Sequence, residues 1–405
     1  MREVQVLGVG MTAFGKFLDR GLKALGGEAV REALADAGVT AEQLEAAFVG
    51  NAMAGLVTGQ ECIRGQVILR SLGLGGLPVY NMENACASAS TAFHTAWMAV
   101  AGGMYDVVLA LGVEKLYHED KTRSFAALGS AVDVEAAEAF RREINRDRGE
   151  EAAAGAGERR SVFMDFYASE AREHMARHGT RREDYALIAV KNHGNGSLNP
   201  KAQFQRARTL EEVLAAPMIA DPLTRLMCSP IGDGAAAAIL VSADFARRHA
   251  GATPVTVAAS VLASGAPAAG RDTAVVTRAA DRAYRMAAVG PEDLDLAEVH
   301  DASAPAEIFL YEELGFCRAG EGGRLVSDGV TALSGKLPVN SSGGLLAKGH
   351  PVGATGIGQV VEVVEQLRGR GGARQVPGAR VALTQNAGGV LEGEPAACAV
   401  HIFTV

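Results

Sequence analysis

An internal repeat constrains the fold of this chain more than any other feature of its sequence. In the second half, a helix-forming segment at Ala274–Ala288 precedes a strand-forming segment at Leu294–Val299. The same order is found earlier, where Leu22–Ala37 precedes Leu44–Val49. Amphipathic helices that alternate with apolar strands predict an α/β fold in which helices cover buried sheets.

The repeat continues around two loops of unusual composition. In the first half, the stretch Glu83–Ser90 leads into an alanine-rich helix, and the apolar run Asp106–Gly112 follows it. In the second half, the glycine-rich stretch 340–356 leads into a helix, and the strand-forming run Arg380–Leu383 follows it. We therefore predict a duplicated α/β unit whose function lies where the two copies meet.

The length and composition are compatible with two such halves. The chain has 405 residues, of which 48% are hydrophobic, and this is enough for more than one domain-sized core. We predict an N-terminal half at residues 1–250, with an inserted loop domain at about 116–225 where the composition changes. The C-terminal half is expected at residues 251–405.

Charge and cysteine content exclude several classes of protein. A net charge of −8 gives no basic face for nucleic acid, and no apolar run approaches the length of a membrane span. The five cysteines are scattered and form no Cys-x-x-Cys pair, so neither a disulfide framework nor a metal site is expected. A reducing cytoplasm is the compartment that we expect.

Two residues in the unusual loops are candidates for chemistry. Cys86 is expected at the first turn of its helix, where unpaired N–H groups would lower the thiol pKa and favour a nucleophilic thiolate. His350 is expected in a rigid loop, where a neutral imidazole can accept the proton of a nearby thiol. The alternatives are a buried structural cysteine and an incidental surface histidine.

These motifs resemble those of the thiolase superfamily. Glu-Asn-Ala-Cys-Ala-Ser around Cys86 and the Gly-Gly-x-x-x-x-Gly-His-Pro-x-Gly-Ala-Thr-Gly stretch around His350 are similar to its two central motifs. His300–Asp301–Ala302–Ser303 resembles the His-Asp-Cys-Phe motif of the branch that contains the sterol-carrier-protein thiolases. The resemblance implies two similar halves in α/β/α/β/α layers, with an inserted loop domain.

The resemblance also implies roles for individual residues. Cys86 would accept the acyl group, His350 would activate the thiol, and His300 would be a second donor to the thioester oxygen. The N–H of Cys86 and the Gly388–Gly389 turn, with Gly389 as its donor, would form another oxyanion hole. Two alternatives remain open at this point: His300 could be a structural histidine, and the glycine pair could be only a tight turn.

The chain departs from the family where a second cysteine would move a proton. Ala302 occupies the position of that cysteine in His-Asp-Cys-Phe, and Gln385–Gly389 carries none where other thiolases have one. We interpret the cysteines outside the motifs as structural. The proton-transfer group is therefore unassigned, and the candidates are Asp301, Ser303 or a water held by His300 and His350.

The resulting hypothesis is a thiolase that cleaves a 3-oxoacyl-CoA with free CoA, or runs the reverse Claisen condensation. Coenzyme A would be a cosubstrate, with no permanently bound cofactor, and its phosphates could use cations in Lys115–Arg123 and Lys191–Arg208. The alternative for those cations is a solvated surface. Benzoylsuccinyl-CoA is a candidate substrate. Rival hypotheses are acyl transfer to a phenolic carbon and a non-catalytic scaffold subunit. A homodimer or larger oligomer is expected, and a small zinc-finger/OB-fold subunit is a possible partner.

Overall fold

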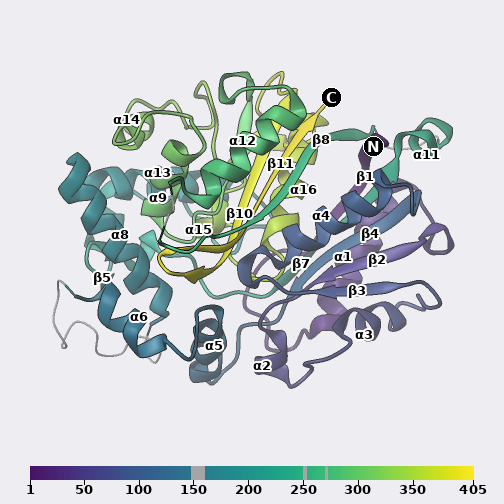
Figure 1. The fold of residues 1–405 in the computed structure, drawn as a ribbon, viewed down its shortest axis with the longest axis horizontal. Helices are drawn as coiled ribbons and strands as arrows, with labels where there is room; N and C mark the ends of the chain where they lie inside the picture. The colour runs from purple at the N-terminus through teal and green to yellow at the C-terminus, as the bar shows by residue number, and fades with distance from the viewer. Residues whose placement is uncertain (147–159, 250–252, 270–271) are drawn as a thin grey trace.

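A computed structural model describes residues 1–146, 160–249, 253–269 and 272–405 (Figure 1). The boundary predicted at 250/251 lies outside the described residues. The core of the fold is a nine-stranded sheet with the order β3-β2-β4-β7-β1-β8-β11-β10-β9. Its strands are β1 (Val4–Met11), β2 (Ala46–Gly50), β3 (Val79–Met82), β4 (Val107–Glu114), β7 (Gly234–Ser242), β8 (Val255–Ser264), β9 (Leu296–Glu298), β10 (Val381–Leu391) and β11 (Glu394–Thr404).

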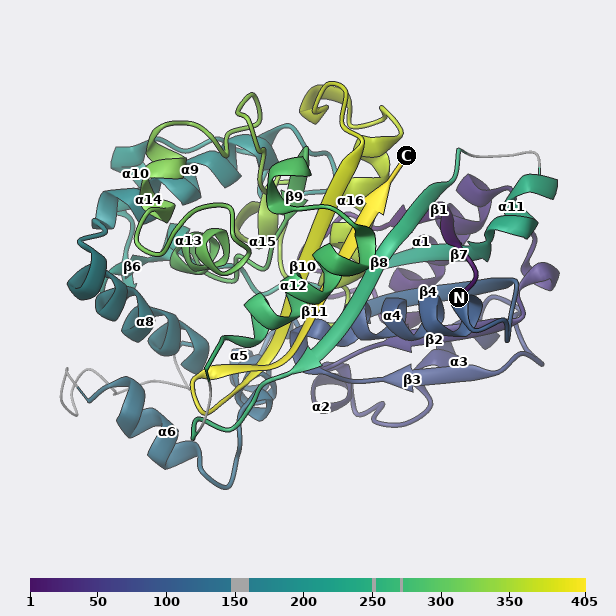
Figure 2. The same ribbon diagram turned by 45° about the horizontal axis from the view of Figure 1, so that its top comes forward.

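Helices surround this sheet on its faces and at its ends (Figure 2). They are α1 (Leu22–Ala37), α2 (Ala54–Thr58), α3 (Arg64–Arg70), α4 (Ser88–Ala101), α5 (Lys121–Leu128), α6 (Ala137–Ile144), α8 (Val162–His178), α9 (Arg182–Ser197), α10 (Leu210–Ala215), α11 (Ala243–Arg248), α12 (Val275–Ala287), α13 (Ala304–Glu313), α14 (Gly322–Ser327), α15 (Gly344–Ala347) and α16 (Thr355–Leu367).

The two sections of the sheet have the same strand order. In β3-β2-β4-β7-β1 the strands run third, second, fourth, fifth and first along the chain. The other section, β9-β10-β11-β8, has this order once Val339 is added, because Val339 forms a parallel bridge to Ala297 of β9. The sections join where β1 pairs with β8, through Gln5 opposite Thr256 and Val6 opposite Val255. The predicted duplication is therefore present in the strand topology.

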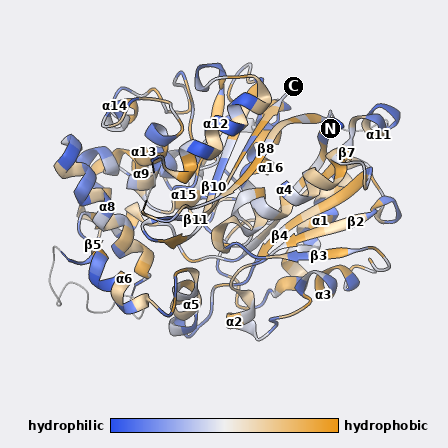
Figure 3. Ribbon diagram, in the orientation of Figure 1, coloured by the Kyte–Doolittle hydropathy of each residue, from blue (hydrophilic) through white to orange (hydrophobic). Residues whose placement is uncertain are grey.

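Three hydrophobic clusters show how the layers are stacked. One cluster packs α1 and α3 against one face of the first section, and another packs α12 and α13 against the far face of the second. Between them, α4 and α16 pack together with strands of both sections. The result is the α/β/α/β/α layering predicted from the family resemblance. Figure 3 shows the strands as mostly apolar ribbons and α8, α11 and α12 with polar segments.

Between β4 and β7, the described residues form the helices α5, α6, α8, α9 and α10, with a short hairpin of β5 (Met218–Ala220) and β6 (Leu223–Thr224). Its helices α8 and α9 share a hydrophobic cluster with α13 and the strands of the second section. The inserted segment therefore packs on the C-terminal half, although in the sequence it lies within the N-terminal half. Among the described residues, no helix combines the length and apolarity that a membrane crossing requires.

Candidate active site

Cys86 lies in a tight turn between β3 and α4. The turn is a 3-10 segment, Ala85–Ala87, and α4 begins only at Ser88, so the expectation that Cys86 sits in the first turn of the α-helix is wrong by two residues. Ala85 has a positive φ of 47°, a conformation that is strained for a residue with a side chain. The Ser88 hydroxyl donates to the Ala85 carbonyl at 2.7 Å and so holds the turn in place.

The expected thiolate is also not the resting state of Cys86. Burial and the charges of Glu114 and Glu83 raise the pKa of the thiol to about 12, although N–H groups of Cys86 and Gly389 lower it. A helix end lowers the pKa of a thiol, but here desolvation and the nearby carboxylates outweigh that effect. At neutral pH the sulfur therefore carries its proton and needs a base at the moment of attack.

His350 can supply that base. Its Nδ1 lies 2.7 Å from the Thr355 hydroxyl, which donates its own hydrogen to the Pro351 carbonyl at 2.9 Å. Since the hydroxyl has one hydrogen, the imidazole must donate from Nδ1, and Nε2 is left as an acceptor. Burial and the neighbouring His300 lower the pKa of His350 well below its usual value, so the ring is neutral at rest.

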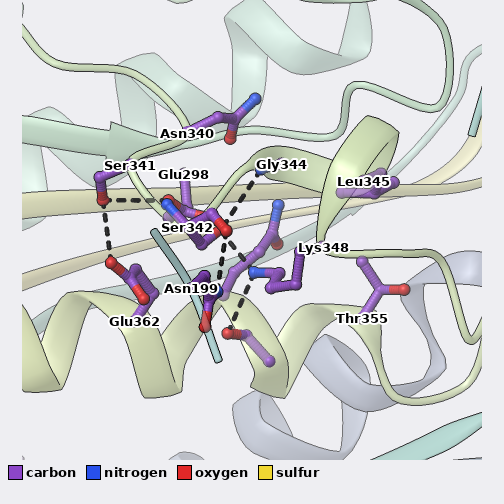
Figure 4. Close-up of polar contacts among 12 residues, drawn as sticks. Asn199, Glu298, Asn340, Ser341, Ser342, Gly344, Leu345, Lys348, Thr355 and Glu362 are labelled. Atoms are coloured by element: carbon purple, nitrogen blue, oxygen red, sulfur yellow. Dashed lines mark hydrogen bonds and ion pairs between the residues drawn. The ribbon is translucent and has the colours of Figure 1, made fainter. Parts of the chain in front are cut away.

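A buried polar network holds the loop before His350 (Figure 4). Lys348 is fully buried and its ammonium lies 3.3 Å from the Glu298 carboxylate. The same carboxylate accepts the N–H of Ser342 at 2.9 Å, and Ser341 bridges Glu298 and Glu362. Because β9 supplies Glu298 and α16 supplies Glu362, the loop is fixed to both of these elements.

His300 follows the end of β9 and has the opposite hydrogen-bond pattern. Its Nδ1 lies 2.9 Å from the Asn386 side-chain nitrogen, and Asn386 in turn accepts from Ser90 at its oxygen. The amide nitrogen only donates, so Nδ1 of His300 is the acceptor and its hydrogen lies on Nε2. Burial lowers the pKa of His300 to about 3, and the ring is therefore a neutral donor.

The structure brings these three residues together. The Cys86 sulfur and imidazole nitrogens of His300 and His350 all lie within 4.8 Å of one another, and the two rings meet edge to face at 5.1 Å. The site thus places a thiol, an imidazole that accepts a hydrogen bond and an imidazole that donates one next to each other. The same three atoms could hold a metal ion.

The three residues open onto a cavity of about 410 Å³. Gly388 and Gly389 line it, and the N–H of Gly389 points at the Cys86 sulfur together with the N–H of Cys86 itself. A side chain at Gly388 would meet the Asn84 carbonyl at 2.1 Å, so the turn needs glycine at this position. All four predicted site residues, Cys86, His300, His350 and Gly389, lie on this cavity, and their roles stay predictions.

Most of the wall was not anticipated from the sequence. Aromatic and aliphatic side chains of the inserted segment form it, among them Phe125 of α5 and Phe163, Phe166 and Tyr167 of α8. The i, i+3, i+4 spacing of the last three could have indicated a shared helix face. Cys228, interpreted as structural, also lines the cavity, although its thiol donates to the Thr224 carbonyl.

The predicted cation segments are only partly available to a ligand. Lys115, Lys191 and Lys201 form ion pairs with Asp233, Glu307 and Glu32, respectively. Arg206 and Arg208 both pair with Glu212. In contrast, Lys121 of the first segment lines the cavity, and so does Arg225, which lies outside both segments; neither has an ion-pair partner among the described residues. Lys16, also on the wall, lies over the Tyr117 ring.

The two named candidates for proton transfer lie off the cavity wall. Asp301 accepts the N–H groups of Leu345 and Leu346, at 2.6 and 3.3 Å, and Asn192 donates to it as well. Ser303 is fully buried, and its hydroxyl has no hydrogen-bond partner among the described residues. Neither residue lines the cavity, whereas Ala302 and Ala387 do.

Comparison with known proteins adds family information to this geometry. Residues 4–244 match the family model described as thiolase, N-terminal domain, and residues 266–400 match thiolase C-terminal domain-like. An acetyl-CoA acetyltransferase of Methanothermobacter thermautotrophicus is 45% identical over 410 residues, covering 100% of both chains. Sterol carrier protein 2 of Gallus gallus is 37% identical over 96% of this chain and 70% of that protein.

Two solved structures illustrate the similarity of fold. An Ltp2-ChsH2(DUF35) aldolase has a TM-score of 0.78 at 26% identity, covering 100% of this chain and 98% of that one. Human mitochondrial 3-ketoacyl-CoA thiolase in complex with CoA has a TM-score of 0.71 at 19% identity, with the same coverage, and shows similarity of fold alone.

Proposed function

This chain belongs to the thiolase family and is an acyltransferase, and from that premise we propose that it cleaves a 3-oxoacyl-CoA with free CoA through an acyl-Cys86 intermediate. The reverse Claisen condensation would use the same groups. The observation that carries the proposal is the arrangement of Cys86, His300 and His350 within 4.8 Å at one cavity. A scaffold without chemistry would not need a thiol between two neutral imidazoles of opposite tautomer.

In the first half-reaction, Nε2 of His350 takes the thiol proton as the Cys86 sulfur attacks the 3-oxo carbon. This coupling is needed because the thiol is protonated at rest. The bond between the two carbons then breaks, and the electrons move onto the thioester oxygen of the leaving fragment. Nε2–H of His300, and the protonated His350, would donate to that oxygen. One such donor is worth about 2.7–4 kcal/mol in the transition state.

In the second half-reaction, the CoA thiolate attacks the acyl-Cys86 carbonyl. The N–H groups of Cys86 and Gly389 converge on the sulfur and would stabilise the oxyanion of this intermediate. His350 would then return its proton to the Cys86 sulfur. Both half-reactions thus use donors that are fixed before the substrate arrives.

Coenzyme A would enter as a cosubstrate past the unpaired cations of the wall. Lys121 and Arg225 have no ion-pair partner among the described residues, and an ammonium or guanidinium is suited to phosphate. Lys191 and Lys201 form ion pairs with Glu307 and Glu32, respectively. We therefore propose that the phosphates of coenzyme A contact Lys121 and Arg225.

The acyl group would be bulky and apolar. The cavity wall contains Phe125, Phe163, Phe166 and Phe204 together with aliphatic side chains. Such a wall favours burial of an aromatic acyl group over a short polar one. This composition supports an aryl-substituted 3-oxoacyl-CoA, of which benzoylsuccinyl-CoA is an example.

Two kinds of partner are supported. Strand β3 is the edge of the sheet, its Tyr80 is 39% exposed, and its free backbone groups can pair with β3 of a second copy, giving a dimer. A small zinc-finger/OB-fold subunit is the second partner that we propose. Its support is the similar aldolase structure, which contains a DUF35 chain.

The proposal is tested by Cys86→Ser. Wild-type protein incubated with acetyl-CoA or benzoyl-CoA is expected to gain one acyl mass on the peptide that contains Cys86, and the variant is expected to gain none. Cys62→Ser, at an exposed cysteine, is the matched control and should label like wild type. Equal labelling of Cys86→Ser would remove the nucleophile assignment. Wild type that neither labels nor turns over 3-oxoacyl-CoAs would support the scaffold hypothesis instead.

A further inference from the structure

The proposed cleavage requires a proton at C2 of the substrate, and Cys86, His300 and His350 do not supply it. When the bond between C2 and C3 breaks, C3 becomes bonded to the Cys86 sulfur and C2 is left as an enolate carbon. The thiol proton has gone to Nε2 of His350, and the hydrogen of His300 points at the enolate oxygen. A second acid in the cavity must therefore deliver a proton to C2.

The protic side chains of the cavity wall differ in their availability. Ser124 donates to the Leu116 carbonyl at 2.7 Å, and Cys228 donates to the Thr224 carbonyl at 3.4 Å. The hydroxyls of Tyr117 and Ser229 have no hydrogen-bond partner among the described residues, and the ammonium of Lys16 lies over the Tyr117 ring. Tyr167 is half-buried, and its hydroxyl has no hydrogen-bond partner within the described ranges. Its proton is therefore not committed to a protein acceptor.

Tyr167 lines the same cavity as Cys86. Burial raises the pKa of Tyr167, and so do the ionisable groups of Cys86 and Asp301. The phenol therefore keeps its proton at neutral pH. The ring is held from one side by Phe166, whose centroid lies 5.4 Å away. Ala302 and Ala387 line the same cavity and present only methyl groups.

We propose that Tyr167 is the acid that protonates C2 of the leaving acyl-CoA, and the base that removes that proton in the condensation direction. This inference rests on the proposed function. In cleavage, the O–H bond of Tyr167 breaks and a C–H bond forms at C2. The resulting phenolate takes the thiol proton of the incoming CoA, whose sulfur then attacks acyl-Cys86. Each proton that leaves a group is thus returned within one cycle.

The test uses Tyr167→Phe, which keeps the ring and removes one oxygen. The first readout is the acyl mass on Cys86 from acetyl-CoA or benzoyl-CoA, which needs His350 but no acid at C2. The second is exchange of the acetyl hydrogens of acetyl-CoA in D2O, and the third is cleavage of acetoacetyl-CoA and benzoylacetyl-CoA. We expect Cys86 to reach the same final extent of labelling, because CoA can also leave as its thiolate, and we expect at least a hundredfold slower hydrogen exchange and a similar loss of cleavage.

Tyr284→Phe is the matched control, because Tyr284 lies on α12 away from the cavity and donates to the Leu314 carbonyl. It should change none of the three readouts by more than twofold. Exchange and cleavage in Tyr167→Phe at wild-type rates would overturn the role of Tyr167. Wild type that labels at Cys86 without hydrogen exchange would also overturn it, while the nucleophile would stand. Absence of labelling in wild type would overturn the proposed function itself.

Discussion

The two halves of the molecule have the same strand order but different side chains at matching positions. Glu45 before β2 accepts the N–H groups of Asp106 and Val107, and Asp295 before β9 accepts those of Arg380 and Val381. These two carboxylates therefore occupy equivalent places, and they set the register between the halves. Counting from them, Gly50 matches His300 and Gly112 matches Asn386.

The glycines of the first half make room for the turn of the nucleophile. A side chain at Gly50 would meet the Ser88 carbonyl at 2.4 Å, and one at Gly112 would meet the Ala89 side chain at 2.6 Å. The second half places an imidazole and an amide at the same two positions, and they hydrogen bond to each other. The first half therefore makes room for the turn that carries the Cys86 sulfur, whereas the second half supplies side chains that donate hydrogen bonds.

The substitution Asn386→Asp removes the amide group that the second half places against His300, and we expect it to have the largest effect. A carboxylate can only accept, so the His300 ring would move its hydrogen to Nδ1 and present a bare Nε2 to the cavity. We expect the rate of carbon–carbon cleavage to fall by about 10²–10³, the usual effect of losing one oxyanion donor. Steady-state kinetics with a 3-oxoacyl-CoA measures this loss.

Ser90→Ala is the control for Asn386→Asp. It removes the hydroxyl that donates to the Asn386 oxygen and leaves the amide nitrogen on His300. Its effect should be no more than a few-fold. A fall as large as that of Asn386→Asp would show that the position of Asn386, and not the tautomer of His300, controls the rate.

The features of the fold and the site that correspond to a recognisable sequence pattern were predictable from the sequence. The layered fold follows from segments whose periodicity repeats in both halves, and the convergence of Cys86, His300 and His350 follows from loops in matching places. The family resemblance then indicated the chemistry.

Features that depend on distant contacts were not predictable. The pKa of Cys86 is raised because β4 brings Glu114 beside the turn, and the helix-end argument does not include that carboxylate. Lys191 could not be recognised as structural before Glu307 was found 2.7 Å from it. The sequence indicates proton-transfer candidates beside His300, whereas Tyr167, the acid that we propose, comes from α8 in the inserted segment.

Glu114 connects the two halves of the molecule. Its carboxylate accepts the N–H of Met53 from the first half and of Gly353 from the second. Its charge also helps to raise the pKa of Cys86. Glu114→Gln should therefore lower that pKa and accelerate alkylation of Cys86 by iodoacetamide at pH 8.5. Because the thiolate is the reactive form, the rate should rise about tenfold each time the pKa falls by one.

Glu83→Gln is the matched variant for this experiment. Its charge raises the pKa of Cys86 less than that of Glu114 does, so its effect on alkylation should have the same sign and a smaller size. Mass spectrometry of the peptide that contains Cys86 gives both rates. An unchanged or slower rate in Glu114→Gln, with an unchanged melting temperature, would contradict the electrostatic account of the resting thiol.

The smallest expected effect concerns the acid sensitivity of the two halves. Burial lowers the pKa of His300 and of His401 to about 3, against an ordinary value of 6.5. Below pH 6.5 each of these histidines is protonated in the unfolded chain but stays neutral in the folded chain. The free energy of unfolding therefore decreases as the pH falls. Each such histidine costs about 1.4 kcal/mol per pH unit. Strands β2 and β4 carry no histidine, whereas His401 lies within β11.

Hydrogen exchange, corrected for the intrinsic pH dependence of amides, should therefore show β10 and β11 losing protection between pH 6.5 and pH 5 before β2 and β4 do. His401→Gln removes one of these protons at a position that does not line the cavity, and it should reduce the difference between the halves. Equal loss of protection in both halves, or an unchanged difference in the variant, would mean that the buried imidazoles do not set the acid limit. In that case the contrast between the halves would apply to the chemistry of the cavity and not to the stability of the fold.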